Sequence, residues 1–268
     1  MTPEAHAKLE EFFSAFHSGA TPLLFLDYDG TLAPFRIDRY RARPYAGVRQ
    51  LLTRIQHQGR TQMAVVTGRP AGEIAPLLGI DPPLEVWGLH GAEHLYPDGR
   101  REIEQPSEQA IGKLDELRAS LRIDSLGGHL EEKANGVVMH WRGASPSQKK
   151  LIERRTRSLF QPLAALDGLS LLDFEAGIEL RSGRDKGGAI AARIDSAAAG
   201  TPVAFLGDDL TDEAGFRVVN AAPGPHLSAL VRRQPRETEA DVWLRPPNDL
   251  RTFLTRWAIA LELVAIES

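Results

Sequence analysis

The sequence contains no cysteine, no excess of basic residues and no long hydrophobic run. Without cysteine the chain has no disulfides, thiolate metal ligands or cysteine nucleophile, and this composition is typical of a reducing compartment. The 32 Lys and Arg residues against 36 Asp and Glu give a formal net charge of −4, which speaks against nucleic-acid binding. No apolar run approaches the roughly 20 residues that cross a membrane, and no signal-peptide pattern is present. We therefore expect a cytoplasmic protein with neither a membrane nor a nucleic-acid partner.

The size and composition are those of a globular protein. The chain has 268 residues, of which 42% are hydrophobic and 25% charged, with 24 Gly and 18 Pro. At about 150 residues per domain, this length corresponds to about two domains. The sequence does not determine the oligomeric state, and a monomer is compatible with it.

Three short apolar runs each end in polar or charged residues. They span 23–26, 63–66 and 203–206, and helical patterns at 46–56 and 185–197 precede the second and third. Short apolar runs bounded by turn residues are typical of strands buried on both faces of a parallel sheet. The predicted fold class is therefore α/β, with a doubly wound, mostly parallel Rossmann-like sheet. In such sheets ligands bind beyond the carboxyl ends of the strands.

The middle of the chain has a different order of elements, which predicts a small α+β domain inserted into the larger fold. We expect the larger domain to comprise 1–105 plus 184–268, and the insert to comprise 106–183. The insert's predicted elements are a helix at 107–121, a hairpin at 128–142 turning at Asn135-Gly136, a helix at 147–160, and strands at 169–174 and 178–181. Elsewhere we expect helices at 4–17, from Thr211 onward and at 249–266, and strands at 229–231 and 241–244.

Two carboxylates stand two residues apart where the first apolar run ends. If the extended backbone continues, Asp27 and Asp29 point to the same side. Asp27 is then able to attack a phosphorus atom as a nucleophile, and Asp29 to act as general acid and base. The other reading is an acidic turn after a strand.

A second acidic cluster follows the third apolar run. Asp208, Asp209 and Asp212 would repel a phosphoryl group unless a hard cation lies between them, and Mg²⁺ suits carboxylate and phosphate oxygens. The alternative interpretation is that these acidic residues only stabilise the N-terminus of a helix. The sequence leaves open whether Asp209 or Asp212 reaches the metal directly or through water.

Phosphate-binding groups are predicted at two further places. Thr67 and Gly68 offer a hydroxyl and backbone N–H groups, and Lys186 at a helix start offers a positive charge. A lone lysine is usually a surface residue. The interpretation therefore depends on four patterns that occur in order along the chain, which are the Asp27 and Asp29 pair, Thr67 with Gly68, Lys186, and the acidic cluster at Asp208.

That ordered set resembles the four motifs of the haloacid dehalogenase-like superfamily, most of whose members are Mg²⁺-dependent phosphotransferases. The resemblance implies that Asp27 is the nucleophile and Asp29 the acid and base. It implies a Mg²⁺ ion held by Asp27, the backbone carbonyl of Asp29, and Asp208. It also makes Thr67 and Lys186 phosphate binders. Because an acid occupies position 29, the implied activity is that of a phosphatase rather than an ion-pumping ATPase.

Longer stretches resemble the trehalose-6-phosphate phosphatase family. They are Asp27–Pro34, Gly88–Glu93, Glu131–Lys133, His140–Arg142 and Gly207–Glu213. The resemblance implies hydrolysis of trehalose 6-phosphate to trehalose and phosphate in trehalose biosynthesis, with the insert acting as a cap domain. The cap residues matched to sugar binding are Glu131, Lys133, Arg142 and Glu179.

The chain departs from that family at two positions. Many relatives have Gly at the position of Ala134, and they often have Lys at that of Glu175. The second change reverses a charge in the implied sugar pocket. A zinc site at His90 and His94 is not expected, because the two residues lack the helical pattern of zinc proteases.

Two other functions stay open at this point. One is a phosphatase or mutase for another sugar phosphate, such as sucrose 6-phosphate. The other is a non-catalytic sugar-phosphate sensor, although a sensor has no chemical need for Asp27, Asp29, Lys186 and Asp208 together.

Overall fold

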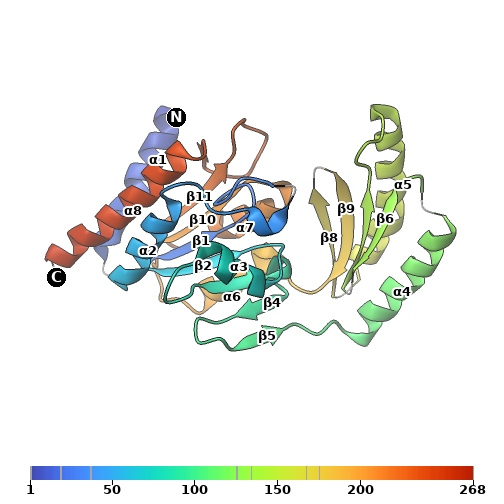
Figure 1. Cartoon of the computed structure of the whole chain (residues 1–268), viewed down its shortest axis with the longest axis horizontal. Coiled ribbons are helices and arrows are strands. Elements are labelled where there is room, and N and C mark those ends of the chain that lie inside the picture. Colours follow the sequence, from blue (N-terminus) through green and yellow to red (C-terminus); the bar gives the residue numbers. More distant parts are fainter. Residues whose placement is uncertain are drawn as a thin grey trace. The chain divides into compact units, whose positions relative to one another are not determined.

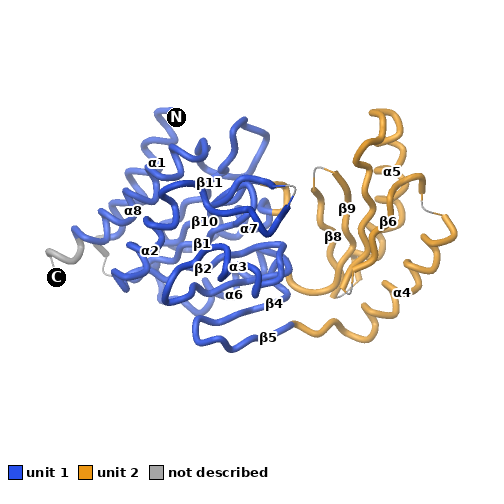
Figure 2. The backbone as a smooth tube through the Cα atoms, viewed as in Figure 1, with its two compact units in different colours: residues 1–103, 185–208, 212–268 blue, residues 104–184, 209–211 orange. Residues whose placement is uncertain are grey.

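The computed structural model describes residues 2–18, 20–36, 38–124, 126–133, 135–166, 168–174 and 176–267. It divides into two compact units (Figure 2). Unit 1 comprises Met1–Ile103, Asp185–Asp208 and Asp212–Ser268, and unit 2 comprises Glu104–Arg184 with Asp209–Thr211. The division into a catalytic core and a cap, at the boundaries given above, stays a prediction.

Unit 1 is built on an eight-stranded sheet in the order β12-β11-β10-β1-β2-β3-β4-β5 (Figure 1). The strands from β12 to β3 run parallel, and β4 and β5 are antiparallel. The predicted fold class is confirmed, and the sheet contains three further strands, β3, β4 and β5, that were not predicted from the sequence. The strand bounds are β1 Leu23–Leu26, β2 Gln62–Val66, β3 Glu85–Gly88, β4 Glu93–Leu95, β5 Arg101–Ile103, β10 Val203–Gly207, β11 His226–Val231 and β12 Val242–Leu244.

Helices cover both faces of this sheet, as the doubly wound prediction requires. The predicted helix at 4–17 ends at Ser14 and continues as a 3₁₀ turn, and the helix expected from Thr211 begins at Glu213 after another such turn. The helices are α1 Pro3–Ser14, α2 Val48–Gln58, α3 Ile74–Leu78, α6 Lys186–Asp195, α7 Glu213–Asn220 and α8 Asn248–Glu267. The 3₁₀ turns are η1 Ala15–Ser18, η2 Arg39–Arg41, η3 Ala71–Glu73, η4 Leu89–Gly91 and η5 Leu210–Asp212.

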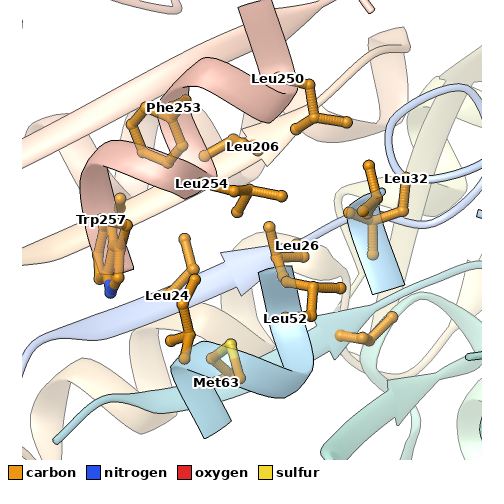
Figure 3. Packing of buried hydrophobic residues seen from close by; sticks show 14 of the residues in the cluster. Leu24, Leu26, Leu32, Leu52, Met63, Leu206, Leu250, Phe253, Leu254 and Trp257 are labelled. Carbon is orange, nitrogen blue, oxygen red and sulfur yellow. The ribbon is translucent and has the colours of Figure 1, made fainter. Parts of the chain in front are cut away.

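The central strand β1 explains how the two faces are packed. Successive side chains of a strand point to opposite faces, and all four residues of β1 are buried. Leu24 and Leu26 join the cluster that contains residues of α1, α2 and α8, including Trp257 (Figure 3). Leu23 and Phe25 join the cluster formed with α6 and α7. A strand buried on both sides cannot shift without exposing apolar area, so its carboxyl end is held in place.

Unit 2 is a four-stranded antiparallel sheet with both of its helices on one face (Figure 1). Val137, Met139, Ile178 and Leu180 form the core with these helices. Because side chains alternate along a strand, the opposite face carries Glu131, Lys133, Glu179 and Arg181. The elements are α4 Glu108–Ile123, β6 His129–Lys133, β7 Gly136–His140, α5 Pro146–Ala164, β8 Leu169–Phe174 and β9 Gly177–Ser182.

The predicted hairpin is present, but its turn is not centred on Asn135-Gly136. Gly136 is the first residue of β7 and pairs with Lys133 and Arg181, and it is not among the residues with positive φ. A Cβ at this position would lie 2.9 Å from Glu179 Oε1. Glycine at position 136 therefore allows β7 and β9 to approach closely, and it does not form a tight turn. Ala134 lies outside the described residues.

Within the described part of the chain, no helix is both long and apolar enough to span a membrane.

Candidate active site

Three adjacent parallel strands end at the same edge of the unit 1 sheet. Asp27 follows β1, Thr67 follows β2 and Asp208 follows β10, while Lys186 is the first residue of α6. The backbone continues the ladder here, because the Asp27 amide donates to the Leu206 carbonyl at 2.8 Å. All four side chains are buried. The structure thus brings together at one place residues that the sequence separates by up to 181 positions.

Lys186 lies between two carboxylates. Its Nζ donates to Asp27 Oδ1 and to Asp212 Oδ1, each at 2.7 Å. Burial raises the pKa of Asp27 to about 7; Lys186 opposes this shift and the negative charge of Asp212 adds to it. Burial lowers the pKa of Lys186, but the attraction of Asp212 and Asp27 outweighs it, and the net direction is upward. Lys186 therefore stays charged, and Asp27 is a carboxylate of unusually high basicity.

Two glycines, Gly30 in the loop after β1 and Gly207 at the end of β10, allow the carboxylates to approach this closely. Gly30 has a φ of +88°, and a Cβ there would lie 2.0 Å from Asp208 Oδ2. A Cβ on Gly207 would lie 2.4 Å from Asp212 Cγ. The Asp208 amide also donates to Asp212 Oδ2 at 2.9 Å. Side chains at either glycine position would push the acidic residues apart.

The acidic residues form a group that suits a cation. Ligand oxygens of Asp27, Asp208 and Asp212 all lie within 4.8 Å of one another. Both Asp212 oxygens already accept hydrogen bonds, from Lys186 and from the Asp208 amide. Asp27 Oδ2, in contrast, is buried without a hydrogen-bond partner among the described residues. Asp27 Oδ2 is thus the oxygen best placed to meet a cation, and Asp212 holds Lys186 and the Asp208 backbone in place.

Asp29 is paired with Arg69, which is not among the predicted site residues. Arg69 Nε donates to Asp29 Oδ2 and Arg69 Nη2 to Asp29 Oδ1, each at 2.6 Å. Asp29 is nevertheless close enough to Asp27 for its charge to contribute to the raised pKa of Asp27. The available signal was that Arg69 directly follows Thr67-Gly68 in the loop after β2.

The loop after β2 also places Thr67 and Gly68. Thr67 Oγ1 accepts from the Arg69 amide at 3.2 Å, and its own amide donates to the Trp87 carbonyl at 2.8 Å. A Cβ on Gly68 would lie 2.6 Å from His90 Nε2, so any larger residue there would require the His90 ring to move. His94 has different surroundings, because its ring stacks on Trp87 and its Nε2 lies 2.9 Å from Glu85 Oε1.

Three of the four predicted sugar-binding residues share one face of the unit 2 sheet. Glu131 pairs across β7 with Val138, and Val138 pairs with Glu179, so they form one row. Lys133 Nζ donates to Glu179 Oε2 at 2.8 Å. Arg142 is exposed in the turn beyond β7, outside this row. Glu175 lies outside the described residues.

The fold is that of the haloacid dehalogenase-like hydrolases. A haloacid dehalogenase-like hydrolase from B. subtilis has the same fold, with a TM-score of 0.61 at 15% identity, covering 87% of this chain and 98% of that one. A family model described as trehalose-phosphatase matches residues 25–245. The chain therefore belongs to the trehalose-phosphatase family.

Individual relatives agree with this assignment. The chain is 31% identical over 257 residues to a trehalose-phosphate phosphatase of Mycolicibacterium paratuberculosis, covering 91% of this chain and 64% of the relative, so it spans only part of that protein's length. The structure of Aspergillus fumigatus trehalose-6-phosphate phosphatase matches with a TM-score of 0.74 at 24% identity, covering 94% of this chain and 97% of the other.

Proposed function

We propose that this protein is a Mg²⁺-dependent phosphatase that hydrolyses trehalose 6-phosphate to trehalose and phosphate through an aspartyl-phosphate intermediate, in trehalose biosynthesis. The observation that carries the proposal is the buried Asp27 carboxylate, whose Oδ1 is held by Lys186 while Oδ2 has no partner among the described residues. Family membership supports the choice of substrate. A cytoplasmic location stays a prediction from the sequence.

The donor set fits Mg²⁺. The ion prefers oxygen ligands and is usually held by one or two carboxylates plus substrate phosphate and water. Asp27 and Asp208, with the backbone carbonyl of Asp29, would hold it. When bound, Mg²⁺ would neutralise charge on the phosphoryl oxygens and so allow a carboxylate to approach them.

In the first step, Asp27 would attack phosphorus while the bond from phosphorus to the sugar O6 breaks. The leaving oxygen needs a proton, and Asp29 would donate it as general acid. The products are free trehalose and phospho-Asp27. Lys186 would support this step: it has three N–H donors, two of which bind Asp27 and Asp212, so the third can bind a phosphoryl oxygen. Thr67 and the Gly68 amide would bind the other oxygens.

In the second step, Asp29 is a carboxylate and would take a proton from water. That water attacks phosphorus, the bond to the Asp27 oxygen breaks, and inorganic phosphate leaves. Asp27 is regenerated as a carboxylate and Asp29 as an acid, so both residues return to their starting states.

Recognition of the sugar would fall to unit 2. Glu131, Lys133 and Glu179 combine acceptors and donors on one sheet face, which matches hydroxyl groups that both donate and accept. Arg142 is proposed as a fourth contact from the neighbouring turn.

The experiment is phosphate release from a panel of trehalose 6-phosphate, sucrose 6-phosphate and glucose 6-phosphate, with and without Mg²⁺. We expect a preference for trehalose 6-phosphate, and loss of turnover in Asp27→Asn. The matched control is Asp195→Asn, the same change at an exposed residue at the end of α6. Equal rates on all three sugars would refute the substrate, and turnover in Asp27→Asn would refute the nucleophile.

A further inference from the structure

Arg69 binds both oxygens of the Asp29 carboxylate. The two hydrogen bonds, each of 2.6 Å, form the bidentate arrangement in which an arginine recognises a carboxylate most strongly. The Arg69 side chain is only 7% exposed, whereas that of Asp29 is 25% exposed. Arg69 is thus the buried and better-fixed member of the pair.

Neighbouring groups hold Arg69 on several sides. Its Nη1 donates to the Arg39 carbonyl at 2.7 Å, and its guanidinium carbon lies 5.5 Å from the centre of the Tyr28 ring. Its amide donates to Thr67 Oγ1, and its carbonyl accepts from the Leu89 amide at 2.9 Å. Arg69 therefore links the loop after β1 to the loop after β2 and has little freedom to move.

This pairing limits what Asp29 can do. A guanidinium has no acceptor and does not lose its proton in proteins, so it can neither supply nor receive the proton that catalysis moves. Each Asp29 oxygen accepts one hydrogen bond from Arg69 and keeps a further lone-pair site at which a proton can bind. The proton therefore moves through a lone-pair site that Arg69 leaves open, and the two hydrogen bonds fix the direction in which that site points.

We propose that Arg69 is a positioning residue for the acid and base of the reaction. It holds the Asp29 carboxyl group in one orientation, so that an open lone-pair site serves the sugar O6 and then the attacking water. This inference rests on the proposed phosphatase mechanism, and it assigns to Arg69 a role in proton transfer rather than in phosphate binding.

The test compares Arg69→Gln and Arg69→Lys with the native protein on two substrates. Trehalose 6-phosphate has an alkoxide leaving group that needs a proton, whereas p-nitrophenyl phosphate has a good leaving group that does not. In Arg69→Gln we expect kcat for the sugar phosphate to fall about 10- to 100-fold, with KM changed less than threefold. Arg69→Lys keeps the positive charge but cannot bind both Asp29 oxygens in the bidentate geometry of a guanidinium. Its kcat for the sugar phosphate should lie between those of Arg69→Gln and the native protein.

Rapid mixing with p-nitrophenyl phosphate measures the initial burst of nitrophenolate, which should not appear if Arg69 has a purely structural role. Arg69→Gln should release close to one equivalent of nitrophenolate quickly and then turn over slowly, because only the second step needs Asp29. The control is Arg193→Gln, which removes another partly buried arginine, paired with Glu85 at 3.1 Å, and should show neither effect.

Three outcomes would overturn the inference. A large rise in KM with unchanged kcat would make Arg69 a substrate-binding residue. Loss of the first equivalent together with a lowered melting temperature in both variants would make its role structural. Native-like steady-state turnover would show that the pairing does not matter. If the native protein cleaves only p-nitrophenyl phosphate, the sugar substrate is wrong, and the burst experiment still decides the role of Arg69.

Discussion

Replacing Gly30 with alanine tests whether the position of Asp208 sets the activity. A Cβ at residue 30 would lie 2.0 Å from Asp208 Oδ2, whereas ordinary van der Waals contact begins at 3.4 Å. The Asp208 carboxylate must therefore retreat by more than 1 Å. A displacement of that size in a catalytic group can lower the rate about 100-fold. The left-handed φ of +88° adds a destabilisation of about 1–2 kcal/mol for any residue with a Cβ.

Gly99→Ala separates these two effects. Gly99 has a φ of +87°, and a Cβ there would meet nothing within 4 Å. Both variants should lose about 1–2 kcal/mol of stability in urea unfolding, while only Gly30→Ala should lose phosphate release and Mg²⁺ affinity, measured by titration calorimetry. Gly30→Ala with native Mg²⁺ affinity and turnover would refute the placement of Asp208 as a ligand that must lie against residue 30.

Three further predictions follow from the buried charges and the core. Lys186→Met leaves Asp27 and Asp212 without their cation and should cost about 3–5 kcal/mol in urea unfolding; a loss below 1 kcal/mol would contradict the buried pairing. The pKa of Asp27 is raised to about 7 in the folded state from 3.8, so its contribution to stability is present below pH 4 and is lost as the pH rises to 7. In Mg²⁺-free buffer, native protein should therefore lose stability relative to Asp27→Asn by up to about 1.4 kcal/mol per pH unit across that window; a constant difference would argue against the raised pKa. Trp257→Ala removes a fully buried ring and should lower stability by about 3–5 kcal/mol while turnover per folded molecule stays native; an unchanged melting temperature would show that the ring is not packed as described.

Local patterns account for the parts of the fold that the sequence predicts well. β1, β2 and β10 are apolar runs buried on both faces, so their composition alone marks them, and Asp27, Thr67 and Asp208 follow from their ends. β4 and β5 lack such a signal. β4 has three residues with a buried glutamate, and all three residues of β5 are exposed. Their pairing, rather than their residue types, makes them strands.

The partners of the site residues could not be read from local patterns. Arg69 pairs with Asp29 across 40 positions, and Lys186 pairs with Asp27 across 159. The sequence also left the role of Asp212 open, and only its two hydrogen bonds show that it orients Lys186 and the Asp208 backbone. The sequence offers each charged residue several possible partners of opposite charge. The packing of the folded chain decides which of them lies within 3 Å.

The sequence by itself determined the kind of sheet, the residues at its carboxyl edge and the chemistry those residues can perform, because burial and chain direction are properties of short segments. The tertiary structure decided which charges meet and which glycines make room for them. Contact between distant segments depends on how whole faces pack, and no short segment carries that information.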